Sequence, residues 1–295
     1  MAEFLTAALS MDFMRYALLT GVLASVACGV VGTYVVVRRI SYIAGAISHI
    51  VLGGLGAAMY LQKVHGWAWC RPQYGAVVSA LGSALIIGFV SLRAKEREDT
   101  VIGALWAVGM AVGILFLWKT PGYGQDLMSY LFGNILMVTP SDLWLIATLD
   151  ALVVGLCLVF YNQFLAVCFD EEFAGLRGLN VECFYLLLLC ITAVTVVLLV
   201  TVVGIVLVIA LLTLPVAVAG YFARRLWVMM LVSVGLSALF TTAGLALSYG
   251  PDLPSGATII VLAGAAYLVV ILAKALLGRP RRLRVPPRTE TERRP

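Results

Sequence analysis

Apolar segments long enough to cross a membrane recur through almost the whole of this 295-residue chain. A helix needs roughly 20 apolar residues to cross a bilayer core of about 30 Å. Hydrophobic residues make up 62% of the sequence and charged residues only 12%, half the share of about 25% that soluble domains carry. Because so few residues remain for a water-facing domain, the sequence predicts an all-α polytopic membrane protein embedded in a lipid bilayer.

Nine membrane crossings are predicted, with eight or ten as the alternatives. They are residues 16–37, 43–61, 74–92, 101–118, 143–160, 184–202, 205–221, 226–247 and 258–277. The sixth and seventh share one apolar stretch, Val181–Tyr221, which we expect to divide near Gly204. Met1–Met14 is predicted not to span, and Asp126–Val138 is typical of an interfacial or re-entrant helix. Residues 1–278 therefore form one transmembrane domain.

The basic residues indicate the orientation of the chain. One consistent assignment places 16 of the 20 lysines and arginines on a single side, which the positive-inside rule makes the cytoplasmic side of the inner membrane. The N-terminus is then outside and residues 279–295 are inside. This tail is basic and rich in proline, so we expect it to be disordered. Its charges favour a topology anchor near anionic lipid over a nucleic-acid site.

His49 is the histidine that falls inside a predicted crossing, and polar groups at that depth are functional candidates. At helical spacing its face consists of Ser41, Gly45, His49 and Gly53. Small residues of this kind permit close helix packing, so a tight helix–helix seam with a buried histidine is one interpretation. The other is a metal path, in which the small residues leave room and the imidazole supplies a ligand suited to zinc, iron or manganese.

Asp150 is the acidic residue that falls in the middle of a predicted crossing. No basic residue is expected at the same depth, because the lysines and arginines cluster at the ends of the crossings. A carboxyl group packed on a polar helix face, or protonated, is one interpretation. A carboxylate on a transport path, and hence a second metal ligand, is the alternative.

Residues 169–180 form the only substantial polar loop on the cytoplasmic side. Asp170 is suited to cap a short helix, Glu171 falls in the first turn where the helix dipole favours acidic groups, and Gly178 is suited to end the helix. A short helix at the membrane surface is what a membrane subunit needs to dock an ATPase. The chain contains no GxxxxGK[ST] phosphate-binding loop, so we expect it to be no enzyme and any ATP hydrolysis to belong to a partner.

Four stretches resemble one transporter family, in the same order along the chain. They are residues 38–49 (RRISYIAGAISH), 129–134 (SYLFGN), 169–180 (FDEEFAGLRGLN) and the pair 203–215 (VGIVLVIALLTLP) and 252–256 (DLPSG). Over nearly its whole length the chain resembles the permeases of the zinc, manganese and iron branch of ABC importers. The resemblance implies a type II ABC importer permease fold.

The resemblance also implies partners and roles. The expected partners are a second permease copy, two cytoplasmic ATPases that use ATP, and an extracytoplasmic metal-binding protein. The transported ligand is a divalent metal ion moved by alternating access, with no permanently bound cofactor. His49 is implied as the metal-path histidine, and Asp170, Glu171, Ala174 and Gly178 as the docking residues. Many family members carry an aspartate where this chain has Gly45.

Two other functions remain open on the sequence alone. A permease for a metal chelate of the siderophore or corrinoid type has the same general fold and does not require a histidine on its path. An ion-coupled secondary transporter explains the helices and Asp150, but it leaves the segment 169–180 without a role.

The predicted orientation has a direct test. Single cysteines at Gln125 and Thr289, in a background without the six native cysteines, should react with a membrane-impermeant thiol reagent from opposite sides of the membrane. The reason is that nine crossings place the two positions across the bilayer from each other. Labelling of both positions from one side would replace the nine-crossing topology with an even number.

Overall fold

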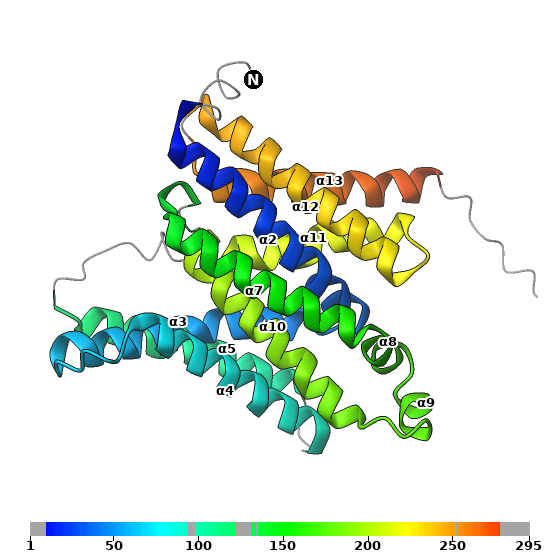
Figure 1. Cartoon of the computed structure of the whole chain (residues 1–295), viewed down its shortest axis with the longest axis horizontal. Coiled ribbons are helices and arrows are strands. Elements are labelled where there is room, and N and C mark those ends of the chain that lie inside the picture. Colours follow the sequence, from blue (N-terminus) through cyan, green and yellow to red (C-terminus); the bar gives the residue numbers. More distant parts are fainter. Residues whose placement is uncertain are drawn as a thin grey trace, which may run out of the picture.

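The computed structural model describes residues 10–93, 98–121, 131, 133, 135–251 and 253–277, and within these ranges the regular structure is entirely helical. The helices, numbered as in Figure 1, are α2 (Asp12–Val37), α3 (Ser41–Val64), α4 (Pro72–Arg93), α5 (Glu98–Lys119), η1 (Ile135–Met137), α7 (Pro140–Val159), α8 (Tyr161–Phe169), α9 (Glu171–Leu176), α10 (Val181–Val203), α11 (Ile205–Phe222), α12 (Leu226–Tyr249) and α13 (Ser255–Leu277).

Nine helices in the described part of the chain are long and apolar enough to cross a membrane. Each coincides with one of the nine predicted crossings, so the predicted all-α polytopic fold is confirmed. The division of the long apolar stretch is confirmed as well. Gly204 separates α10 from α11 with a φ of +88°, a conformation that residues with a β-carbon rarely adopt.

The two segments predicted not to span lie partly outside the described residues. Residues 1–9 are outside, and residues 12–14 belong to α2, which begins four residues before the predicted boundary because Asp12 suits a first helical turn. Most of the segment 126–138 is outside, and its described end includes the 3₁₀ helix η1. Thr139 and Asp142 then form a capping box that starts α7. The tail 279–295 also lies outside the described residues.

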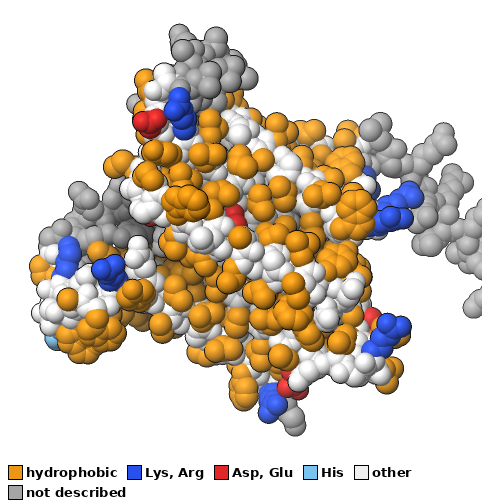
Figure 2. Space-filling view, in the orientation of Figure 1, with side chains coloured by type: hydrophobic (Ala, Val, Ile, Leu, Met, Phe, Trp, Pro, Cys, Tyr) orange, Lys and Arg blue, Asp and Glu red, His pale blue; other side chains and the backbone are white. Residues whose placement is uncertain are grey.

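The crossings are arranged in two groups. Figure 1 shows α3, α4 and α5 side by side in one group, with α2, α7, α11, α12 and α13 in the other. α2 contacts α12, α11 and α7 along its length, and α10 joins the groups by packing against α4 and α3 as well as α2. The surface in Figure 2 is hydrophobic across most of this face, with the basic side chains near its edges, as expected for helices that face lipid.

α3 is well covered by its neighbours, whereas α5 and α13 are not. Of the most apolar 18 residues in each helix, 72% are buried in α3 but only 11% in α5 and in α13. Both exposed helices are hydrophobic, so their free faces require lipid or another protein as a neighbour.

Glycines permit the close approach of α3 and α5. A β-carbon added to Gly53 would lie 2.7 Å from the carbonyl oxygen of Gly109, and one added to Gly56 would lie 2.7 Å from that of Gly113. Contacts this short leave no space for a methyl group. Lipid tails are as apolar as leucine, so helices in a bilayer associate through such close packing and not by the hydrophobic effect.

Gly113→Ala tests the importance of this seam. The new β-carbon would lie 2.7 Å from the backbone carbonyl of Leu52, so α3 and α5 must separate. We expect the variant to lose about 1–3 kcal/mol of stability, the usual effect of overpacking a close contact. Thermal unfolding of the permease in detergent measures the change.

Gly155→Ala is the matched control, because no atom lies within 4 Å of the β-carbon that the substitution adds to α7. It should be neutral or slightly stabilising, since alanine is the better helix former. Equal melting temperatures for the two variants would contradict the close packing of α3 on α5.

Candidate functional site

His49 lies in the N-terminal half of α3 and faces α5. Its imidazole stacks on the indole of Trp106, with ring centroids 4.6 Å apart and planes inclined by 19°. The side chain is half-buried, and its Nδ1 atom is buried without a hydrogen-bond partner among the described residues. The histidine therefore has one buried ring nitrogen without a hydrogen-bond partner among the described residues, and one ring face in contact with an aromatic residue.

The predicted small-residue face is the surface of α3 that packs on α5. A β-carbon on Gly45 would meet the Trp106 ring at 3.5 Å, and Gly53 packs on the backbone of Gly109. Ser41, the first residue of α3, is half-buried at one end of this face. The structure thus shows the helix–helix seam that the spacing suggested. It also leaves His49 part-exposed beside the seam, so the same face keeps an accessible imidazole.

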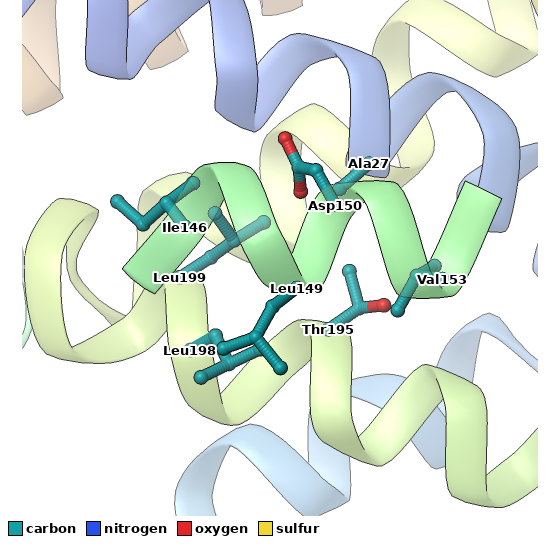
Figure 3. Close-up of a pocket in the computed structure, with 8 residues that line it drawn as sticks. All are labelled: Ala27, Ile146, Leu149, Asp150, Val153, Thr195, Leu198 and Leu199. Atoms are coloured by element: carbon teal, nitrogen blue, oxygen red, sulfur yellow. The ribbon is translucent and has the colours of Figure 1, made fainter. Parts of the chain in front are cut away.

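Asp150 occupies a different interface. It is 8% exposed, and Figure 3 shows its carboxylate between α7 and α2. The adjoining cavity, of about 10 Å³, is lined by residues of α2, α7 and α10, including Ala27 and Thr195. A cavity of this size holds about one water molecule. None of its lining residues belongs to α3 or α5, so within one copy of the chain the structure does not bring Asp150 to His49.

One copy of the chain has no complete metal-binding cluster in its described part. Among the described residues, no three histidine, cysteine, aspartate or glutamate side chains lie close enough together to hold an ion.

The polar segment 169–180 folds as its sequence predicts. The Asp170 side chain caps α9 by accepting a hydrogen bond from the Phe173 backbone N–H at 2.9 Å. Gly178 ends the helix with a φ of +78°, and the next residue donates its N–H to the Ala174 carbonyl at 3.1 Å. This is a Schellman C-terminus, which favours glycine at this position. Ala174 itself is fully buried.

Arg38 ties α9 to the transmembrane helices. It directly follows α2, forms an ion pair with Glu171, and lies 5.3 Å from the centre of the Tyr185 ring on α10. α3 begins only three residues after Arg38, at Ser41. α9 is therefore in contact with the short connection between α2 and the helix that carries His49.

Cys168 lies beside this ion pair at the end of α8. Burial raises the pKa of its thiol to about 11, although the Arg38 guanidinium acts in the opposite direction. The thiol consequently stays protonated and unreactive near neutral pH.

Two features of the site were not predicted from the sequence. The first is a pair of exposed apolar side chains on α9, Phe173 and Leu176, the last of which is 88% exposed, with Phe169 exposed at the end of α8 just before them. Phe173 and Leu176 lie three residues apart, a spacing that places two residues on one face of a helix. The second is Trp106, whose contact with His49 joins two separate crossings and leaves no local signal.

These features together define a class of protein. Nine apolar helices in the described residues, with a short capped helix beside the basic end of α2 and a part-exposed histidine within one crossing, are consistent with a membrane-spanning permease of the ABC type. Comparison with known proteins agrees with this class. The chain belongs to the ABC 3 transport family, which matches residues 10–274.

Several curated relatives match most of the chain. It is 44% identical over 252 residues to a "probable metal transport system membrane protein" of Chlamydia pneumoniae, covering 85% of each chain. It is 43% identical over 269 residues to an uncharacterized membrane protein of Synechocystis, covering 91% of this chain and 93% of the relative. A "manganese transport system membrane protein MntC" of Halalkalibacterium halodurans is 34% identical over 261 residues, covering 86% and 85%.

A solved structure also matches the fold. The chain resembles PsaBC from Streptococcus pneumoniae, solved in complex with a Fab, with a TM-score of 0.81 and 29% identity, covering 92% of this chain and 95% of that one. The resemblance to ABC importer permeases that the sequence motifs suggested is thereby confirmed.

Proposed function

We propose that this chain is the permease subunit of an ATP-driven importer that moves a divalent transition-metal ion (zinc, manganese or iron) into the cytoplasm. The observation that carries the proposal is the part-exposed side chain of His49 within a crossing, with a buried ring nitrogen that has no hydrogen-bond partner among the described residues. Imidazole is a ligand for all three metals. The names of the relatives put manganese first, whereas Gly45 provides no oxygen ligand of the kind that manganese prefers.

A second copy of the chain completes the path in this proposal. His49 is part-exposed, and the neighbouring α5 is largely uncovered. An ion at this position in contact with lipid would be prohibitively unstable, because hydrocarbon offers a charge no polar partner. A homodimer that places this face at its interface shields the ion and doubles the number of ligands.

Coupling to ATP follows from the position of α9. Two cytoplasmic ATPases dock on α9 and its exposed apolar face, and their closure on ATP moves α9. The ion pair between Glu171 and Arg38 passes this movement to α2 and α3, so the path at His49 opens alternately to each side. An extracytoplasmic metal-binding protein delivers the ion to the outward-open state.

The alternatives explain fewer of these features. An ion-coupled secondary transporter leaves the capped α9 and its apolar face without a role. A chelate permease leaves the accessible His49 without one. The chain does share its fold with an inward-facing putative metal-chelate type ABC transporter, at a TM-score of 0.67 and 15% identity, but this degree of similarity concerns the fold alone.

Leu176→Asp tests ATPase docking. The side chain is 88% exposed, so the change should leave the thermal stability of the permease unaltered. It places a charge in the apolar face that the partner covers, and we expect co-purification of the ATPase to be lost. The matched control is Met137→Asp, which changes a residue that is 77% exposed on η1, away from α9. It should retain the ATPase.

A broader variant addresses the docking residues themselves. If the combined replacement of Asp170, Glu171, Ala174 and Gly178 still yields a stoichiometric complex with normal transport, the docking assignment is wrong. The purified permease alone should hydrolyse no ATP.

His49→Ala tests the metal path. Alanine suits both a helix and a seam of small residues, so the fold and ATPase binding should persist while metal uptake is lost. Normal uptake per folded molecule would instead show that the histidine is structural. Whole-cell contents of zinc, manganese and iron, measured in cells that lack the permease, identify the metal.

Gly45→Asp is a second test of the same face. A β-carbon fits at this position, 3.5 Å from Trp106, and the carboxylate would add an oxygen ligand one turn from the imidazole. We expect a shift in selectivity towards manganese or a slower release of the ion. Unchanged uptake and selectivity in this variant and in His49→Ala would move the assignment away from this face, with Asp150 as the next candidate.

A further inference from the structure

Trp106 of α5 contacts the part of α3 that surrounds His49. Besides stacking on His49, its indole lies against Gly45 and against the ring of Tyr42, whose centroid is 5.6 Å away. One side chain from α5 therefore meets α3 at three positions. A β-carbon at Gly45 would lie in ordinary van der Waals contact with this indole, 3.5 Å from its ring.

Among the described residues, no hydrogen bond to the Nδ1 atom fixes the orientation of the His49 ring. Rotation of a histidine ring about χ2 is broad, and metal-binding histidines are normally oriented by a hydrogen bond from the second ring nitrogen to a carboxylate, carbonyl or water. The Nδ1 atom of His49 has no such partner among the described residues. Something else has to hold the ring in one plane, and the parallel indole face 4.6 Å away is in position to do so.

Stacking also favours the metal-bound state of the histidine. An imidazole that coordinates a cation carries part of its positive charge, and the face of an indole attracts positive charge. The contribution grows when water is excluded, as it is beside a helix seam within the bilayer.

The position of the indole is itself fixed by the seam. Trp106, Gly109 and Gly113 lie at i, i+3 and i+7 on α5 and so face the same way. Both glycines pack directly on the α3 backbone, with added β-carbons 2.9 Å or less from backbone atoms of Ile50 and Leu52. This packing fixes the register of α5 on α3 and holds Trp106 level with His49.

We infer that Trp106 is a positioning residue for the ion site: it orients the His49 imidazole by stacking, in place of the usual hydrogen bond. This inference rests on the proposed function of His49 and adds a specific role for a residue of another helix. An aromatic side chain is what position 106 requires, so phenylalanine should substitute where leucine of similar bulk should not.

The test uses the purified permease in lipid nanodiscs with Mn²⁺ as the probe, since the paramagnetic resonance signal of free Mn²⁺ reports binding directly. Trp106→Leu should weaken Mn²⁺ binding about tenfold, the lower end of the effect of losing an orienting partner. Trp106→Phe should bind within about threefold of the wild type, because a phenyl ring also stacks. The matched control is Trp118→Leu on the same helix, where the indole is 88% exposed, and it should bind normally.

Tryptophan fluorescence gives a second readout, which reports whether the bound ion lies beside Trp106. Bound Mn²⁺ should quench Trp106, so part of the quenching in the wild type should be missing in Trp106→Phe and in His49→Ala. This comparison does not depend on the stability of the leucine variant.

The outcomes separate the two hypotheses. If His49→Ala loses Mn²⁺ binding while Trp106→Leu binds like the wild type, the positioning role of Trp106 is wrong and the metal path stands. If His49→Ala binds Mn²⁺ like the wild type, the proposed function of His49 fails. If Trp106→Phe is as weak as Trp106→Leu, stacking is not what orients the ring.

Discussion

The close contact between the backbones of α3 and α5 is the interaction on which the rest of the candidate site depends. In a bilayer the hydrophobic effect does not hold helices together, so packing must supply the attraction. Gly53 and Gly56 on one helix meet Gly109 and Gly113 on the other, at distances that exclude any side chain. This contact sets which residues of the two helices lie opposite each other, and it thereby places Trp106 beside His49.

The seam and the proposed path are compatible uses of one surface. Small residues on α3 bring α5 close, but the imidazole is too large to be enclosed by the seam and stays part-exposed at its side. The exposed side adjoins α5, which is itself largely uncovered. A second copy of the chain is therefore needed for a stable ion site in the proposed mechanism, and the weak binding of one copy suits release of the ion.

The short helix α9 is stabilised in a different way from the membrane crossings. α9 has only six residues and is too short to be stable by itself. Three features stabilise this helix: the cap at Asp170, the stop at Gly178, and the ion pair of Glu171 with Arg38. Because Arg38 lies between α2 and α3, the anchor that stabilises α9 is also a mechanical connection to the helix of His49. The exposed apolar residues beside it provide the surface for a partner.

The sequence by itself determined the number and approximate bounds of the crossings, the break at Gly204 and the cap and stop of α9. These features depend on local properties: the length of an apolar run, the conformational freedom of glycine and the hydrogen bonds of a capping side chain. The sequence also indicated His49 as a candidate, because a polar group within an apolar run is rare. The neighbours of His49 and Asp150 were decided only by the tertiary structure. Helical spacing indicated the small-residue face of α3 as a packing seam, but spacing within one helix does not indicate which other helix meets that face. Packing of whole helices put Asp150 against α2 and α10 and put His49 against Trp106 of α5.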